Sequence, residues 1–313
     1  MEKIFGDSNQ LMPDAITVIT RELGVSREEV TDITALKRGM TNRSFRFSCR
    51  GKKYIIRVPG EGTGKLINRA QEAAVYHTIA EKNIGDDIVY IDPREGYKIT
   101  LFLERARVCN PNNADDVEKC MKRLREFHEL GLKVDHEFNI FRQIDFYESL
   151  WNGAPSAYKD YEEVKERVFS LQPYINAHID RKVLAHIDAV PDNFLFVGNE
   201  AGEEEIRLID WEYAGMQDPH VDIAMFCIYA LYDREQVDRL IEAYFPEGCP
   251  AEIHTKIYCY IAACGLLWSN WCEYKRKLGI EFGEYALRQY DYAREYCRLA
   301  QEEQKEQEGA DHV

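Results

Sequence analysis

Three side chains in two short stretches of the sequence have the types and spacing that phosphoryl transfer needs. Asp188 and Asn193 stand five positions apart in HIDAVPDNFLF (186–196), and Asp210 follows in LIDWEYAG (208–215). Phosphoryl transfer depends mainly on positioning the attacking hydroxyl and stabilising charge on the phosphate oxygens. An Asp can orient the hydroxyl and accept its proton, while an Asn and a second Asp offer hard oxygen ligands to Mg²⁺. We therefore interpret Asp188 as a base, and Asn193 and Asp210 as magnesium ligands.

The same Asp-x4-Asn spacing, followed by a metal-binding Asp, occurs in protein kinases. This sequence has HID where the kinase template has H-R-D, and DWE where it has D-F-G. The alternative interpretation is that His186 and Asp188 tie down a loop and that Asp210 merely ends a strand. The predicted hairpin between the two stretches and the strands upstream favour catalysis. His186 is interpreted as a loop anchor and not as a catalyst.

Two kinds of hydrophobic pattern divide the chain near residue 103. Helical periodicity predicts helices over 12–30 and 68–82. Alternation of apolar and polar residues predicts early strands at 44–49, 53–58, 87–92 and 97–103. From about residue 112 helices dominate, apart from a predicted hairpin formed by 193–197 and 206–210. The sequence thus predicts an α+β fold with a nucleotide-binding lobe over 1–103 and a helical catalytic and substrate-binding lobe over 104–313.

A phosphate-binding turn is predicted in RGMTNRSF (38–45). Gly39 permits a tight turn, and Thr41 and Asn42 offer hydrogen-bond donors at the start of a strand. An ordinary hairpin turn is the alternative. On the next predicted strand, Arg57 can grip phosphate and pair with Glu72 of the following helix, as a kinase lysine pairs with its helical glutamate.

Aromatic residues recur at helical spacing in the second half of the chain. Trp268 and Trp271 stand three apart in LLWSNW, and Tyr229 and Tyr232 stand three apart in FCIYALYD. Such stripes are usually core. An aromatic cage is also how proteins hold a quaternary ammonium group, which offers no hydrogen bonds. Because these stripes follow a phosphotransfer motif in an acidic region, a cation-binding role is the competing interpretation.

Charge and composition limit the remaining choices. The net charge is −15, which argues against nucleic-acid binding. Residues 1–107 carry a net charge of +3 and residues 108–313 a net charge of −18, which suits an anionic nucleotide facing a cationic substrate. No apolar stretch is long enough to insert into a membrane. Nine cysteines without a CxxC pair predict a reduced, cytoplasmic protein without disulfides or a zinc site.

At this level of detail the sequence resembles the choline/ethanolamine kinase family, and most closely its bacterial LicA-type branch within the aminoglycoside-phosphotransferase-like group. The similarity extends from about residue 34 to residue 300. It is carried by RGMTNRSF, IIRVPGEGTGKLINRAQE, HIDAVPDNFLF, LIDWEYAGMQDPHVDIA and WSNWCEYKRKLGIEFGEYALRQYDYA.

The resemblance implies a two-lobed protein-kinase-like fold and a choline kinase activity. The implied reaction transfers the γ-phosphoryl group of ATP to the choline hydroxyl, with Mg²⁺, and yields phosphocholine and ADP. In this family Asp188 would be the base, and Asn193 and Asp210 the metal ligands. Arg57 would take the place of the invariant kinase lysine.

The resemblance also implies the substrate contacts. Trp268, Trp271 and Tyr232 would line the ammonium pocket, with Tyr229 as the alternative tyrosine. Glu212 would act at the metal or at the alcohol. ATP's adenine would lie against the backbone of Leu103 and Glu104.

Two other functions remain open at this point. One is a kinase of ethanolamine, an amino sugar or an aminoglycoside, whose primary amine favours carboxylate hydrogen bonds over aromatic faces. The other is a non-catalytic binding module in a kinase fold. The sequence assigns neither the oligomeric state nor the nucleotide preference.

Overall fold

The computed structural model describes residues 11–36, 42–60, 64 and 66–310, which form two compact units. The first, which we call the sheet unit, runs up to Arg107 and includes Leu195–Tyr213. The second, the helical unit, comprises Val108–Phe194 and the chain from Ala214 onward.

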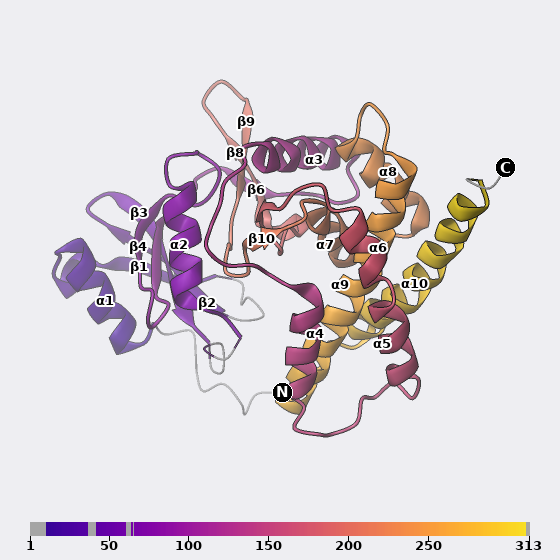
Figure 1. The fold of residues 1–313 in the computed structure, drawn as a ribbon. Helices are drawn as coiled ribbons and strands as arrows, with labels where there is room; N and C mark the ends of the chain where they lie inside the picture. Colours follow the sequence, from indigo (N-terminus) through magenta and orange to yellow (C-terminus); the bar gives the residue numbers. More distant parts are fainter. Residues whose placement is uncertain (1–10, 37–41, 61–63, 65, 311–313) are drawn as a thin grey trace. The chain divides into compact units, whose positions relative to one another are not determined.

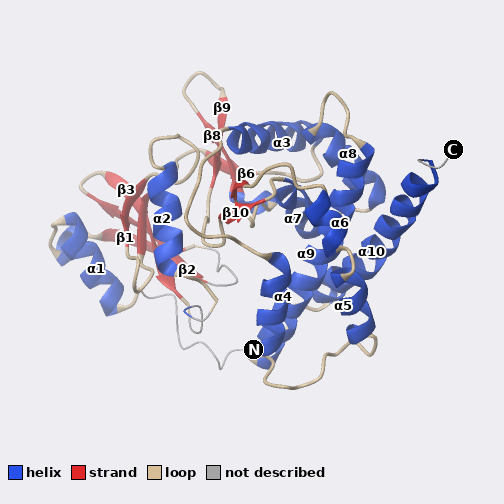
Figure 2. Cartoon of the chain, viewed as in Figure 1, coloured by secondary structure: helices blue, strands red, loops and turns tan. Residues whose placement is uncertain are grey.

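The sheet unit is built on a five-stranded antiparallel sheet of order β1-β2-β3-β5-β4 (Figures 1 and 2). Its strands are β1 (Thr31–Ala35), β2 (Asn42–Cys49), β3 (Lys52–Pro59), β4 (Ile88–Ile91) and β5 (Lys98–Leu101). Phe45, Ile56 and Ile99 are cross-strand partners on one face, and they pack with α1 (Pro13–Leu23) in a buried core. Because side chains alternate across a strand, Arg57 and Lys98 project from the opposite face, toward α2 (Arg69–Ile79).

The hairpin between the two motif stretches belongs to a second small sheet. Strands β8 (Phe194–Gly198) and β9 (Glu204–Leu208) lie beside β6 (Ala106–Val108), in the order β6-β8-β9. The Leu208 amide donates to the carbonyl of Ile84 at 2.7 Å, which ties β9 to the sheet unit. The compact units therefore differ from the predicted lobes in this segment, which the sequence placed within 104–313. The assignment of nucleotide binding to one lobe and catalysis to the other stays a prediction.

The helical unit consists of helices and one small two-stranded sheet, β7 (Val183–Ala185) with β10 (Gly215–Gln217). Its helices are α3 (Ala114–Glu129), α4 (Ile140–Ser149), α5 (Tyr161–Phe169), α6 (Gln172–Ala177), α7 (His220–Ala230), α8 (Arg234–Tyr244), α9 (Ala251–Lys277) and α10 (Glu284–Ala310). Helix α9 is buried over most of its length, between α10, α7 and α4. A Cβ on Gly265 would lie 2.7 Å from the Gln289 carbonyl oxygen, so the close crossing of α9 and α10 requires glycine there. Among the described residues, no helix combines the length and apolar character that crossing a bilayer demands.

Two local predictions differ from the structure. The helix predicted over 12–30 ends at Leu23, because Gly24 adopts a left-handed conformation (φ 60°) that closes α1. A 3₁₀ turn (Arg27–Glu29) and then β1 follow it. The strand predicted over 206–210 ends at Leu208, because Asp210 has a φ of 66° and leaves the extended conformation.

A histidine that joins three helices makes stability depend on pH. The Nδ1 atom of His254 lies 3.2 Å from Glu303 of α10, and its Nε2 atom lies 3.4 Å from Asp238 of α8. Burial opposes the charged ring, but the Glu303 hydrogen bond and both carboxylates outweigh burial and raise the pKa of His254 above 6.5. A raised pKa stabilises the fold below the unfolded-state pKa and loses that effect as pH rises through the folded pKa.

We therefore expect His254→Gln to lower the free energy of unfolding more at pH 5.5 than at pH 8.5. The difference should be about 0.5 kcal/mol, as for partly exposed ion pairs. Urea unfolding of both proteins at both pH values measures it, and subtracting the wild type removes the contributions of other groups. An equal loss at the two pH values would contradict the charged pairing.

Candidate active site

A buried cluster of arginines and carboxylates lies on the α2 side of the large sheet. Arg57 of β3 donates from both terminal nitrogens to the two carboxylate oxygens of Glu72 on α2, and the Nη2 bond measures 2.8 Å. Both side chains are almost fully buried. Burial alone would raise the pKa of Glu72, but the Arg57 hydrogen bonds outweigh it and lower this pKa. The predicted Arg57–Glu72 pair therefore forms, while its part in nucleotide binding stays a prediction.

A second arginine, which sequence reasoning missed, extends this cluster. Arg69 donates to Glu72 at 2.9 Å, to Glu212 at 3.1 Å and to the Oδ1 atom of Asn42 at 3.1 Å. Asn42 in turn donates from Nδ2 to Glu212 at 2.8 Å. The only sequence signal for Arg69 is its position one helical turn before Glu72.

Asp210 lies at the more open side of the cluster. Its side chain is 35% exposed, and its Oδ1 atom lies 3.6 Å from Arg57 Nη1. That oxygen is buried and has no hydrogen-bond partner within the described residues. Carboxylate oxygens of Glu72, Asp210 and Glu212 come within 4.8 Å of one another. Burial, and next the charge of Asp210, raise the pKa of Glu212.

This donor set fits a divalent cation. Hard oxygen ligands and an unsatisfied carboxylate oxygen are what Mg²⁺ requires, and a cation would relieve the repulsion between Asp210 and Glu212. Glu72 is the poorest ligand of the three, because Arg57 and Arg69 already engage its oxygens.

Asp188 and Asn193 meet within the helical unit. Asn193 donates from Nδ2 to the Asp188 carbonyl at 2.8 Å and to its Oδ2 atom at 3.1 Å. A short 3₁₀ turn (Pro191–Asn193) brings the two residues together across the five-residue spacing. The amide thus fixes the orientation of the Asp188 carboxylate.

A buried aspartate on α7 holds the backbone before Asp188. Asp222 accepts from the amides of His186 and Ile187 at 2.8 and 2.7 Å, and its Oδ2 lies 2.9 Å from Nε2 of His128. Ile187 has a φ of 68°, which is strained for a β-branched residue. Asp222 therefore holds in place a backbone conformation that the sequence of this loop disfavours.

The four aromatic residues of the predicted cage differ in exposure: Tyr229 is partly exposed, and Tyr232, Trp268 and Trp271 are buried. Helix α7 ends at Ala230, and Leu231 has a left-handed φ of 56°, so Tyr229 and Tyr232 do not share the predicted helical face. Tyr232 is buried, with its hydroxyl on the Pro111 carbonyl at 2.5 Å. Tyr229 is partly exposed and donates to Asp192 at 3.0 Å.

Tyr229 begins a chain of rings that reaches the two tryptophans. Its ring centroid lies 6.2 Å from that of Tyr285, and Phe282 connects Tyr285 to Trp271 with centroid distances of 6.4 and 5.1 Å. Trp268 and Trp271 meet edge to face at 5.5 Å and are buried.

The partly exposed rings and the buried rings are therefore expected to have different roles. Burial first, and then negative charges that include Asp188, raise the pKa of both Tyr229 and Tyr285. Phe282 and Tyr285, which are partly exposed, were missed as site residues although the stretch EFGEY carried part of the family resemblance. In the structure the accessible rings are therefore Tyr229, Phe282 and Tyr285, with the tryptophans packed behind Phe282.

Two other predicted nucleotide contacts, Leu103 and Glu104, lie elsewhere in the sheet unit. Leu103 and Glu104 follow β5, and the Glu104 carboxylate lies 3.0 Å from Lys53 Nζ at the surface. Gly39 and Thr41 lie outside the described residues. Roles for these four residues in binding ATP stay predictions.

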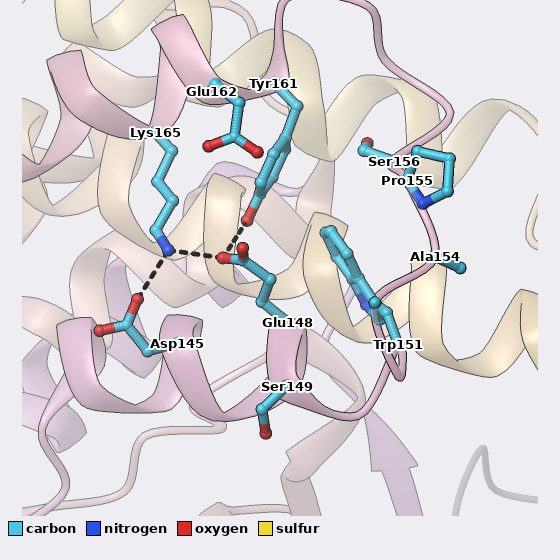
Figure 3. A pocket seen from close by; sticks show the side chains of 11 residues that line it. Asp145, Glu148, Ser149, Trp151, Ala154, Pro155, Ser156, Tyr161, Glu162 and Lys165 are labelled. Carbon is cyan, nitrogen blue, oxygen red and sulfur yellow. Dashed lines mark hydrogen bonds and ion pairs between the residues drawn. The ribbon is translucent and has the colours of Figure 1, made fainter.

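A pocket of about 450 Å³ between α4 and α5 contains none of the predicted site residues (Figure 3). Lys165 lies 2.8 Å from Asp145 and 2.5 Å from Glu148, and Tyr161 donates to Glu148 at 2.9 Å. Three charged groups of this pocket, Lys165, Asp145 and Glu148, are therefore already paired with one another.

Comparison with known proteins identifies the class to which this fold belongs. The structure resembles the crystal structure of choline kinase LicA from Streptococcus pneumoniae with a TM-score of 0.77 at 28% identity, over 90% of this chain and 98% of that one. A structure of LicA in complex with AMP matches with a TM-score of 0.76 at 28% identity, over 91% and 98% of the two chains. The α+β fold is therefore the predicted two-lobed protein-kinase-like fold.

The family follows from the sequence match. The family model described as choline/ethanolamine kinase matches residues 33–246. Protein LicA of Haemophilus influenzae is 26% identical over 265 residues, which cover 81% of this chain and 97% of that protein. The chain belongs to the choline/ethanolamine kinase family. It is accordingly a phosphotransferase with an alcohol group as acceptor, a kinase of choline or a related amino-alcohol with ATP as co-substrate.

Proposed function

We propose that this protein is a choline kinase that transfers the γ-phosphoryl group of ATP to the hydroxyl of choline, giving phosphocholine and ADP. The observation that carries the choice of choline is the row of partly exposed rings, Tyr229, Tyr285 and Phe282, in which Tyr229 donates to Asp192, four residues beyond Asp188. A trimethylammonium group cannot accept or donate hydrogen bonds, so aromatic faces and a nearby carboxylate are the groups that attract it. The choline hydroxyl is only two carbons from that nitrogen, so a cation held by these rings keeps its hydroxyl near Asp188.

Asp188 acts as the base in this proposal. Its carboxylate is oriented by Asn193 and its loop by Asp222, so it can hold the choline hydroxyl in line and take its proton late in transfer. A weak base is enough for this role, because the attacking oxygen loses its proton late in a loose transition state.

Asn193 and Asp210 are proposed to hold Mg²⁺ together with phosphate oxygens of ATP. The orphaned Oδ1 atom of Asp210 supports this assignment. When bound, the ion would neutralise charge on the phosphate oxygens. Glu212 is proposed to act beside Asp210, since Arg69 and Asn42 fix its carboxylate there.

Arg57 is proposed to contribute positive charge near the phosphates, since Glu72 holds its guanidinium in place. The AMP complex of LicA supports adenine-nucleotide binding by this fold. We propose that the adenine contacts the backbone of Leu103 and Glu104.

Ethanolamine is the second candidate substrate. Asp192 accepts from Tyr229 and is exposed, so it offers a carboxylate to a primary ammonium group beside the same ring. The structure of this neighbourhood thus contains groups for either headgroup.

The deciding experiment measures ADP release from ATP and Mg²⁺ with choline, ethanolamine and kanamycin in parallel. We expect kcat/KM to be highest for choline, by about tenfold or more over ethanolamine, as one cation–π contact of 1–2 kcal/mol implies. A preference for ethanolamine or kanamycin would leave the phosphotransferase intact and refute choline. No turnover with any of the three would refute all of these substrate assignments.

A further inference from the structure

We propose that Arg69 and Gly96 are positioning residues for phosphoryl transfer: the guanidinium of Arg69, seated over the bare Cα of Gly96, holds Glu212 and Asn42 in place beside Asp210. This inference rests on the proposed function, because it gives the carboxylates around Asp210 a task in catalysis. Neither residue was among those predicted from the sequence.

Arg69 joins three segments that are far apart in the chain. Its acceptors are Asn42 at the start of β2, Glu72 on α2 and Glu212 beyond β9, and all three are buried. Two different terminal nitrogens make these bonds, at 2.9 to 3.1 Å. A planar guanidinium fixes the mutual geometry of its acceptors, which a flexible ammonium group does not.

Gly96 supplies the space that this guanidinium needs. A Cβ at this position would lie 2.4 Å from Arg69 Nε and 2.6 Å from its Cδ. The Gly96 carbonyl also accepts from Arg57 Nη2 at 3.1 Å, so the turn contacts both arginines. The turn itself is rigid, because Asp92 accepts from the amides of Arg94 and Gly96 through its side chain and carbonyl.

Position, more than charge, distinguishes Arg69 from its neighbours. Arg57 already neutralises Glu72 bidentately and lies 3.5 Å from Glu212. Lys98 adds another cation on the same face of the sheet. Arg69 hydrogen-bonds Glu212, Glu72 and Asn42 at the same time, and so braces the direct Asn42–Glu212 bond.

The first test is Arg69→Lys, which keeps the charge and removes the planar fork. We expect kcat/KM for the amino-alcohol to fall by about 10² at saturating ATP, as displacement of reacting groups by about 1 Å does. The matched control is Arg107→Lys in the same unit, whose bidentate partner Glu204 lies at the surface, and it should stay within about twofold.

A binding measurement separates positioning from a general loss of structure. Titration calorimetry gives the affinity for ADP with and without Mg²⁺. We expect Arg69→Lys to leave the metal-free affinity within about threefold and to reduce the gain that Mg²⁺ produces by at least about tenfold. Misfolded protein would instead lose both affinities.

The second test displaces Arg69 without changing it. Gly96→Ala should reproduce the effects of Arg69→Lys, because the new methyl group occupies the place of the arginine side chain. Gly51→Ala is the control: its φ of 77° imposes strain similar to that at Gly96 (φ 82°), but a Cβ there meets nothing within 4 Å. Gly51→Ala should lower stability and leave the Mg²⁺-dependent gain unchanged.

Different experimental results would contradict the proposed function and the positioning role of Arg69. A wild-type protein without turnover on any of the three alcohols contradicts the proposed function. Equal Mg²⁺-dependent gains in the wild type, Arg69→Lys and Gly96→Ala contradict the positioning role, whether or not the wild type turns over.

Discussion

Asp188→Asn should reduce kcat by about 10² to 10⁴, the range that one positioned acid–base group contributes. The substitution is nearly isosteric. Because Asn193 can still donate to the carbonyl oxygen of the new amide and to the backbone at position 188, the loop geometry should persist. What disappears is the ability to accept a proton from the alcohol.

Affinity for ATP and thermal stability should therefore stay near wild-type values in Asp188→Asn. Single-turnover rates with saturating ATP measure the chemical step directly. Asp135→Asn is a suitable control, because it removes an exposed carboxylate from the same unit. A kcat within tenfold of the wild type would refute the assignment of Asp188 as the base.

Tyr229→Leu should raise the KM for choline by about tenfold or more, the equivalent of 1–2 kcal/mol of cation–π attraction. The useful comparison is with 3,3-dimethylbutan-1-ol, which has the shape of choline without its charge. Loss of a ring face weakens binding of the cation specifically, so the KM for the neutral alcohol should change little. Tyr229→Phe keeps the ring and should keep the preference for the cation.

Tyr232→Leu is the matched control in the same stretch of sequence. Its ring is buried against Phe226, with centroids 6.0 Å apart, and its hydroxyl is held by Pro111. We expect this variant to lose stability, by about 2–4 kcal/mol for a truncated buried aromatic residue, without losing the preference for choline. If Tyr229→Leu raised both KM values equally, the ring would contribute shape and not cation binding.

Local patterns predicted the elements that carry the site. The alternation of apolar and polar residues predicted the strand that carries Arg57, and helical periodicity predicted the helix that carries Glu72. The predicted pair of these two residues forms in the structure. The Asp-x4-Asn spacing assigned Asp188 and Asn193 to one site, and in the structure a 3₁₀ turn brings the two side chains into contact. Such contacts follow from short-range geometry, which a sequence displays.

Contacts between distant segments could not be predicted in the same way. Arg69 and Glu212 are separated by 143 positions, and nothing in either stretch specifies the other. The turn at Leu231 was also missed, because leucine rarely adopts a positive φ and the spacing of Tyr229 and Tyr232 mimics a continuing helix. The sequence likewise predicted Asp210 at the end of a strand, because the pattern of residues 206–210 does not reveal its positive φ.

The left-handed backbone of Ile187 has a consequence for protein engineering. Such a conformation costs a non-glycine residue about 1–3 kcal/mol, and Asp210 on the other motif shares it. Selection for heat resistance alone would reward glycine or asparagine at position 187, since both tolerate this geometry. This gain in stability would come from changing the segment that orients Asp188. We therefore expect a more heat-stable enzyme obtained in this way to turn over more slowly. Improvement of this protein for practical use is better directed at exposed helices than at its motif loops.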